Sequence, residues 1–187
     1  MAKTNHNTII QGLHGRLGPQ LVVKYDKFGR TIVGLKPHFD EHRSFSPAQK
    51  NHQLAFREAT AYAVSAQNND VYVQKAAGTP LTRYNIALSD WFHPPEILDV
   101  DLDAWTGQPG QIIRIKARDD VLVKQVALLI SDGAGLLLEQ GLAVQVDPLC
   151  WQYTTTLPAN TAHPVVIAFA QDLPGHIARL EKTKVRE

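Results

Sequence analysis

Cysteine is almost absent from this sequence. The 187 residues contain a single one, Cys150, which excludes an intramolecular disulfide and a zinc site built from several cysteines. The sequence also has no excess of charge of one sign. It contains 19 lysines and arginines and 18 aspartates and glutamates, and the formal net charge is +1. Such a chain has no long-range positive field to attract nucleic acid or an anionic membrane surface. Nucleic acid is therefore not expected as a partner.

Long apolar runs are also missing. No segment approaches the ~20 apolar residues of a membrane-spanning helix, and residues 1–18 lack the run of ~7 to 15 apolar residues found in a signal peptide. We expect the protein to be made and kept in the cytoplasm, unless a route other than general secretion carries it out, for example as part of a released particle. The composition, with 44% hydrophobic and 20% charged residues, is that of an ordinary folded chain long enough for two small domains.

The amino-terminal part predicts a β-hairpin. Strand-forming residues 21–23 and 31–33 flank a short loop that ends at Gly29, a pattern typical of two antiparallel strands. Before the hairpin, glycines recur at every third position from residue 12 to residue 18. A phosphate-binding loop follows a strand and opens a helix, whereas these glycines precede a strand. We interpret them as turn residues.

Three helices are predicted next. Ser46, Pro47 and Gln49 form a capping box with proline at the first helical position, so a long helix begins there and ends near Asn68. A short helix is predicted from Asp70 to Ala77, and a third follows Thr82 and ends before His93. The double proline after His93 ends the helical region, because proline cannot continue a helix.

From residue 96 onward the apolar pattern alternates, with a turn signal roughly every 8–12 residues, as in a β-sandwich. The predicted class is therefore α+β: an amino-terminal β-hairpin plus helices, followed by an all-β immunoglobulin-like sandwich. We predict two domains, residues 1–93 with the glycine-rich leader, hairpin and helices, and residues 96–187 with the sandwich.

Two resemblances support this division. The pattern Ile113-x-Ile115-x-Ala117-x-Asp119 and the pattern Val166-x-Ala168-x-Ala170-x-Asp172-x-x-Gly175 resemble strands of bacterial immunoglobulin-like and fibronectin-type sandwich modules. The resemblance implies a fold and leaves the function open, because such sandwiches host many roles. The leader Gly12-x-x-Gly15-x-x-Gly18, with Gly29-x-Thr31, Lys36-Pro37, Ser46-x-Ala48-Gln49 and Phe56, is similar to small bacterial and prophage-like structural proteins, which implies a docking module in a particle.

No group of residues predicts catalysis. None of the five serines lies on the tight elbow that a hydrolase needs, and the pair His38 and His42 falls in a segment that we interpret as a connector. In a sandwich of this kind, Asp119, Asp120 and Asp172 lie in loops at the same end. Their carboxylates could hold calcium, or each could cap its own turn. Apart from calcium we expect no cofactor.

Strand alternation predicts an apolar outer surface. If Val166, Ala168 and Ala170 face the core, their neighbours along the strand point outward, and the adjacent strand adds Leu129. A monomer seldom leaves such a surface open. We predict an interface formed by Val165, Ile167, Phe169 and Leu129, covered either by Tyr84, Leu88 and Trp91 of the third helix or by another subunit.

These observations predict a non-catalytic structural or interaction protein. It would be a self-assembling or docking subunit of a larger assembly, such as a phage-like particle or filament, with protein partners that are copies of itself or other particle subunits. The alternative is a sandwich module that binds carbohydrate or protein, in which Trp105 is the exposed aromatic residue available for stacking. An enzyme of unknown class is the third hypothesis.

Overall fold

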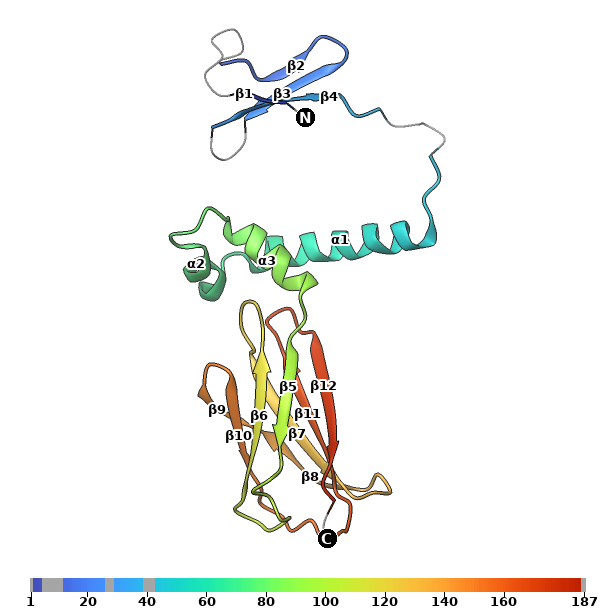
Figure 1. The fold of residues 1–187 in the computed structure, drawn as a ribbon, viewed down its shortest axis with the longest axis vertical. Coiled ribbons are helices and arrows are strands. Elements are labelled where there is room, and N and C mark those ends of the chain that lie inside the picture. Colours follow the sequence, from blue (N-terminus) through green and yellow to red (C-terminus); the bar gives the residue numbers. More distant parts are fainter. Residues whose placement is uncertain (1, 5–11, 26–28, 39–42, 186–187) are drawn as a thin grey trace. The chain divides into compact units, whose positions relative to one another are not determined.

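The computed structural model describes residues 2–4, 12–25, 29–38 and 43–185. These residues form three helices and three antiparallel four-stranded sheets, so the chain is α+β, as predicted (Figure 1). The chain divides into two compact units, Met1–Gln53 and Leu54–Glu187. The boundary predicted between residues 93 and 96 lies inside the second unit, where it separates the last helix from the first strand of the sandwich.

The first unit holds one small sheet, sheet A. Its strands are β1 (Ala2–Thr4), β2 (Gly15–Leu17), β3 (Leu21–Tyr25) and β4 (Thr31–Leu35), in the order β1-β4-β3-β2. Strands β3 and β4 form the predicted hairpin, with Val23 opposite Val33, while residues 26–28 of its loop lie outside the described part. Gly18, between β2 and β3, has φ 67°, which agrees with its interpretation as a turn residue.

Helix α1 (Pro47–Ala66) runs across the division between the units. It begins at the predicted capping box, in which the Ser46 amide donates to Gln49 Oε1 over 3.0 Å and the Gln49 amide donates to Ser46 Oγ over 3.3 Å. The reciprocal pair satisfies two of the backbone donors that the first helical turn leaves free. Within the described residues, no helix is long and apolar enough to cross a membrane.

Helices α2 (Asp70–Ala76) and α3 (Arg83–Phe92) belong to the second unit. Each has a capping side chain, because Asn69 Oδ1 accepts from Val71 N and Thr82 Oγ1 accepts from Asn85 N. The helices share a small buried cluster, and residues from two sandwich loops pack against it. Its members are Ala63, Tyr72, Ile86 and Ala87, with Val121 and Leu173 from the loops. The helical segment of this unit is therefore packed on one end of the sandwich (Figure 1).

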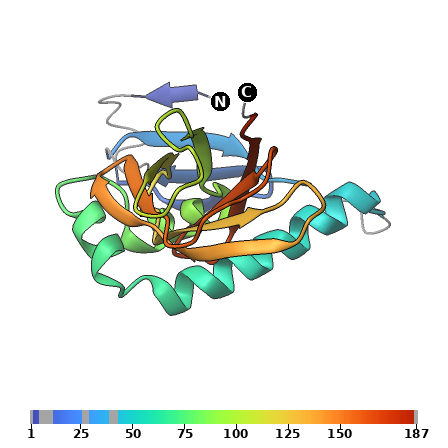
Figure 2. The ribbon, with the colours of Figure 1, turned by 90° about the horizontal axis from the view of Figure 1, so that it is seen from below.

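The sandwich consists of two sheets. Sheet B has the order β5-β6-β10-β9, and sheet C has the order β12-β11-β7-β8. The strands are β5 (Glu96–Asp101), β6 (Ile112–Arg118), β7 (Gln125–Ser131), β8 (Leu137–Leu142), β9 (Val144–Asp147), β10 (Cys150–Thr154), β11 (Val165–Gln171) and β12 (Ile177–Thr183). The two sheets form the layers of the sandwich, which Figure 2 shows from the end opposite the helices.

The sandwich core follows the predicted alternation. Ile113, Ile115 and Ala117 of β6 are fully buried, and so are Val166 and its alternate neighbours in β11. The intervening residues of β6 are exposed, whereas those of β11 are half-buried. This difference between the two outer surfaces is the starting point for the functional site.

One lateral edge of the sandwich is closed by lysines. Strand β12 of sheet C runs beside strand β5 of sheet B, and the Lys182 ammonium donates to the Val100 carbonyl over 2.7 Å. Lys184 donates to the Leu102 carbonyl over 2.8 Å. The Leu102 carbonyl lies just beyond β5 and also accepts from the Trp105 amide, so within the strand itself it is Lys182 that occupies a backbone acceptor at this edge.

Candidate functional site

The outer face of sheet C is apolar across neighbouring strands. Phe169 of β11 lies beside Ala127 of β7, which in turn lies opposite Leu142 of β8. The next row pairs Ile167 with Leu129. Val165 continues the same face of β11, and like Ile167, Phe169 and Leu129 it is half-buried. The structure therefore brings together the four sheet residues that the sequence predicted as an interface. These four residues, with Ala127 and Leu142, are called the sheet C face.

The rim of the sheet C face is polar and balanced in charge. Arg179 of β12 lies opposite Phe169, and Glu181 lies opposite Ile167. The two side chains form an ion pair with each other over 2.6 Å. On the opposite side of the face, Gln140 of β8 lies opposite Leu129. The apolar strip is thus bordered by one ion pair and by neutral polar side chains, which include Thr183 opposite Val165.

The outer face of sheet B has the opposite character. Its strand β6 presents a row of basic side chains, each placed opposite an acidic one on β5. The pairs are Arg118 with Glu96, Lys116 with Asp99 and Arg114 with Asp101. The Arg118 and Glu96 side chains are 2.8 Å apart, and the Arg114 and Asp101 side chains are 3.9 Å apart. Exposed ion pairs of this kind are hydrated, so this part of the surface needs no partner to cover it. The outer face of sheet B is therefore charged along β5 and β6, while Ile112 and Val144 are exposed apolar residues on the same side of that sheet.

The three helical side chains predicted as a cover for the sheet C face pack elsewhere. Tyr84 and Leu88 contact the buried cluster of the helices. Trp91 packs edge-on against His176, with ring centroids 5.3 Å apart, at the loop between β11 and β12. The reason lies in the topology, because the helical segment packs on the end of the sandwich and not along its face.

The aspartates predicted as calcium ligands cap turns. Asp119 Oδ1 accepts from the amides of Val121 and Leu122 over 2.7 and 2.9 Å. Asp172 Oδ1 accepts from the amides of Gly175 and His176, both over 2.6 Å, and Asp172 Oδ2 is 3.0 Å from His176 Nδ1. Both oxygens of Asp172 therefore already have protein donors, which is the turn-capping alternative.

Asp120 does not join the other two. Its side chain is exposed and lies 3.7 Å from His93 Nδ1, and its backbone carbonyl accepts from the Lys75 ammonium. The described residues contain no group of three or more potential ligands that could hold a metal ion. Of the histidine pair considered in the connector, His38 is exposed, and His42 lies outside the described residues.

The expectation that Trp105 is exposed is wrong. Its side chain is 1% exposed and belongs to the core of the sandwich. The loop between β5 and β6 turns back here, because the Trp105 amide donates to the Leu102 carbonyl and Gln111 Oε1 accepts from the Thr106 amide. The indole therefore fills the end of the core and cannot stack on a sugar from outside.

A buried polar chain at the junction of helices and sandwich was missed. The Tyr62 and Tyr72 hydroxyls are 2.6 Å apart, and Tyr72 donates to Asp90 Oδ2. Tyr72 and Asp90 have no exposed surface. The available signal was the position of Asp90, three residues after Ala87 and four after Ile86, which places a carboxyl group on the apolar side of α3.

The electrostatics of Asp90 are unusual. Burial raises the pKa of Asp90 from 3.8 to about 7, and the nearby charges of Asp119 and Asp172 act in the same direction. The hydrogen bond from Tyr72 opposes them, since it favours the carboxylate. The pKa of Tyr72 is raised as well, by burial and by its contact with Asp90. The third carboxyl group at this end of the sandwich is thus Asp90 of α3, and not Asp120.

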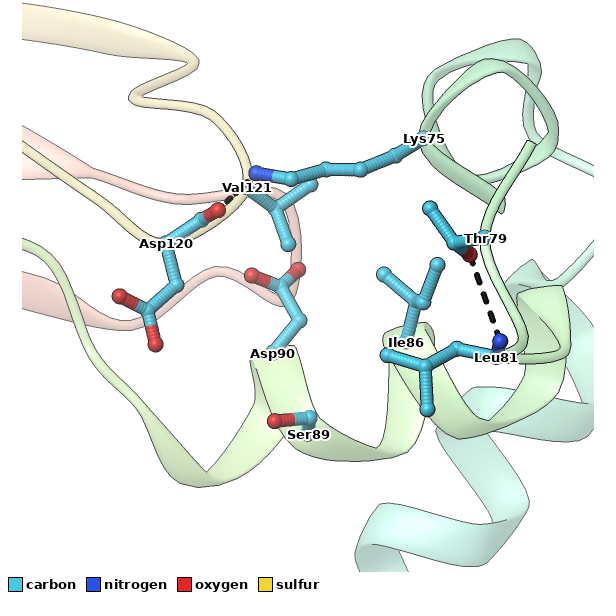
Figure 3. Close-up of a pocket in the computed structure, with 8 residues that line it drawn as sticks. All are labelled: Lys75, Thr79, Leu81, Ile86, Ser89, Asp90, Asp120 and Val121. Carbon is cyan, nitrogen blue, oxygen red and sulfur yellow. Dashed lines mark hydrogen bonds between the residues drawn. The ribbon is translucent and has the colours of Figure 1, made fainter. Parts of the chain in front are cut away.

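A pocket of about 220 Å³ lies beside Asp90 (Figure 3). Its lining residues are Lys75, Thr79, Leu81, Ile86, Ser89, Asp90, Asp120 and Val121. Figure 3 shows the Asp90 carboxyl group turned toward the loop that carries Val121. Because Asp90 is 0% exposed, its carboxyl group is not available to a molecule in this pocket.

A second buried carboxylate joins the two sheets. Glu139 of β8 accepts at Oε1 from the Tyr153 hydroxyl over 2.8 Å, from the Thr156 amide over 2.6 Å and from the Thr156 hydroxyl over 2.8 Å. Its Oε2 accepts from the Leu157 amide over 3.3 Å. Burial raises the pKa of Glu139, but these hydrogen bonds outweigh burial and leave the pKa below its ordinary 4.5.

Comparison with known proteins gives little. No protein-family model matches the chain, and no curated protein sequence matches it. CopC from Methylosinus trichosporium OB3b is 19% identical over 48% of this chain and 89% of that chain, with a TM-score of 0.36. A tetra-tandem repeat in the extending region of a large adhesion protein is 18% identical over 50% of this chain and 23% of that chain, with a TM-score of 0.35. At TM-scores this low, neither likeness bears on the function of this chain.

Proposed function

We propose that the protein is a non-catalytic interaction module that binds a second copy of its own chain through the sheet C face. The observation that carries this proposal is the difference between the two outer faces of the sandwich. Ion pairs lie along β5 and β6 of sheet B, whereas Val165, Ile167, Phe169 and Leu129 form a continuous apolar strip on sheet C. A partner that removes this strip from water gains roughly 25 cal/mol per Å² of apolar area.

A second copy fits the rim of this face. One arginine and one glutamate border the strip, so two copies meeting face to face bring together surfaces without net charge. In a two-fold arrangement Arg179 of each copy can meet Glu181 of the other, because the same patch is used on both sides. A strongly charged partner has no matching charge here. The apolar, balanced character of the face therefore favours self-association.

The non-catalytic part of the proposal has its own support. The polar side chains that cluster at the end of the sandwich already serve as turn caps or buried structural contacts. Carbohydrate binding loses the residue on which it depended, since Trp105 is in the core. A role as a subunit of a phage-like particle remains a proposal that rests on the resemblance of the amino-terminal half.

Self-association is tested by the mass of the full-length protein in solution. Light scattering over a micromolar to millimolar concentration series should give a mass above the 20.7 kDa of one chain. Phe169→Gln should shift the protein toward the monomer. Ile112→Gln is the matched control, because Ile112 is an exposed apolar residue on the outer side of sheet B. A wild-type monomer throughout the series, or equal effects of the two variants, would overturn the proposal.

A further inference from the structure

Two buried carboxyl oxygens at the junction of the helices and the sandwich lack a hydrogen-bond donor. Asp90 Oδ1 of α3 and Asp119 Oδ2, in the loop between β6 and β7, are both buried and find no donor among the described residues. The other oxygen of each group is occupied, Asp90 Oδ2 by Tyr72 and Asp119 Oδ1 by two backbone amides. Each residue therefore has one acceptor atom left over.

A single proton satisfies both atoms. If Asp90 is protonated on Oδ1, that hydroxyl can donate to Asp119 Oδ2, because Asp90 lines one pocket with Asp120 and Val121, the two residues that follow Asp119 in the loop. Two neighbouring ionised carboxylates removed from water would repel each other and leave both oxygens without a donor. The protonated pair thus accounts for the placement of two acidic residues against each other.

We propose that Asp90 and Asp119 share one proton, and that this proton fastens helix α3 to the sandwich and is lost as the pH rises. The pair bridges elements that are far apart in the sequence, since one member belongs to the helical segment and the other to a sandwich loop. Loss of the proton converts an attractive contact into a repulsive one in the same unit. The helices α2 and α3 then pack less firmly on the end of the sandwich.

The groups that face Asp90 come from every element around it. Helix α1 contributes Tyr62 and helix α2 contributes Tyr72, which both stay neutral because their pKa values are raised. The loop after β6 contributes Asp119, and the loop after β11 contributes Asp172, which is paired with His176. Lys75 and His93 approach Asp120 instead, by way of its carbonyl and its carboxylate. No described cation is therefore recorded in contact with Asp90.

The direction of the pH effect follows from the folded and unfolded proton affinities. Burial raises the pKa of Asp90 from 3.8 to about 7, so the folded protein binds one proton more than the unfolded chain between these values. Stability contributed by this proton is fully present below the unfolded pKa and is lost as the pH rises through about 7. In that interval the unfolding constant should rise about tenfold per pH unit.

The Asp90→Asn variant tests whether the shared proton, and not another group, causes the pH dependence of stability. The asparagine amide has the shape of a protonated carboxyl group: its oxygen can accept from Tyr72, and its NH₂ group can donate to Asp119 at any pH. We expect the free energy of unfolding of the wild type in urea to fall between about pH 4 and about pH 7, and that of the variant to lack this component. Asp120→Asn is the matched control, because Asp120 is the exposed neighbour of Asp119 and should keep the wild-type profile.

The place of the change is tested in the wild-type protein itself. Carboxyl carbon NMR should show Asp90 titrating near neutral pH, and amide hydrogen exchange, corrected for its intrinsic pH dependence, should speed up in α2 and α3 more than in β11 as the pH rises. Titration of Asp90 in the ordinary range near pH 4 would overturn the proposal. So would equal pH profiles for the wild type and Asp90→Asn, because removal of the titrating group would then have changed nothing.

Discussion

Replacement of Glu139 by glutamine should destabilise the sandwich more than any exposed substitution. The carboxylate accepts four hydrogen bonds, three at Oε1 and one at Oε2, and is 6% exposed. If the glutamine oxygen takes the place of Oε1, three bonds remain but lose the assistance of the negative charge. The glutamine NH₂ group then faces the Leu157 amide, which is itself a donor.

The size of the effect can be worked from these bonds. Hydrogen bonds to charged groups contribute roughly 1.5–3 kcal/mol each and neutral ones about 1, and a buried donor left without a partner costs roughly 1–3 kcal/mol. Partial loss over three bonds and full loss of one bond gives about 2–4 kcal/mol for Glu139→Gln. The buried location of the group supports the upper half of this interval, because solvent cannot replace the lost acceptor.

Urea unfolding of the full chain, followed by tryptophan fluorescence, measures this change. Glu96→Gln is the control, because Glu96 is exposed and pairs with one side chain, so its change should stay within about 0.5 kcal/mol. Because folding lowers the pKa of Glu139, the stability that its carboxylate contributes should be lost as the pH falls from the ordinary pKa of 4.5 through the pKa in the folded protein. The free energies of unfolding of the wild type and of Glu139→Gln should then converge. Equal losses for the two variants at neutral pH would refute the role given to Glu139.

Three further substitutions test other contacts of the sandwich. Gly141→Ala places a Cβ 2.7 Å from Cε2 of Tyr153, so its melting temperature should fall by the equivalent of roughly 1–3 kcal/mol; an unchanged temperature would contradict this packing. Asp172→Ala removes the acceptor for two amides and should cost about 2–4 kcal/mol in urea unfolding, whereas an unaltered midpoint would mean that the loop reforms without it. Lys182→Met with Lys184→Met removes both ammonium groups from the edge at β5 and frees the Val100 carbonyl, and light scattering should reveal faster aggregation; equal rates would show that the edge is protected otherwise.

Local patterns predicted the parts of the fold that depend on neighbours in the sequence. The capping box at Ser46 and Gln49 fixed the start of α1, and strict alternation identified the inward side chains of β6 and β11. Both signals arise within one element, so no knowledge of the rest of the chain is needed. The apolar sheet C face follows from the same alternation.

Contacts between distant segments were harder to predict. Trp105 lies two residues before Gly107 and precedes a turn, and nothing local shows that this loop folds back over the end of the core. The sequence correctly placed Asp119 and Asp172 in loops at one end, but the carboxyl group that meets them comes from Asp90, on a helix. That meeting depends on how the helices pack, which neither helical periodicity nor turn signals specify.

The lysine-closed edge has a consequence for how copies can multiply. At β5 the Val100 carbonyl is held by the Lys182 ammonium group of the same chain, so an incoming strand would first have to displace this charge-assisted hydrogen bond. Elongation of the sandwich into a continuous cross-chain ribbon is therefore obstructed on this side. A two-fold interface buries the same surface on both copies, so no further copy can bind there. Such pairing yields discrete complexes instead of fibres.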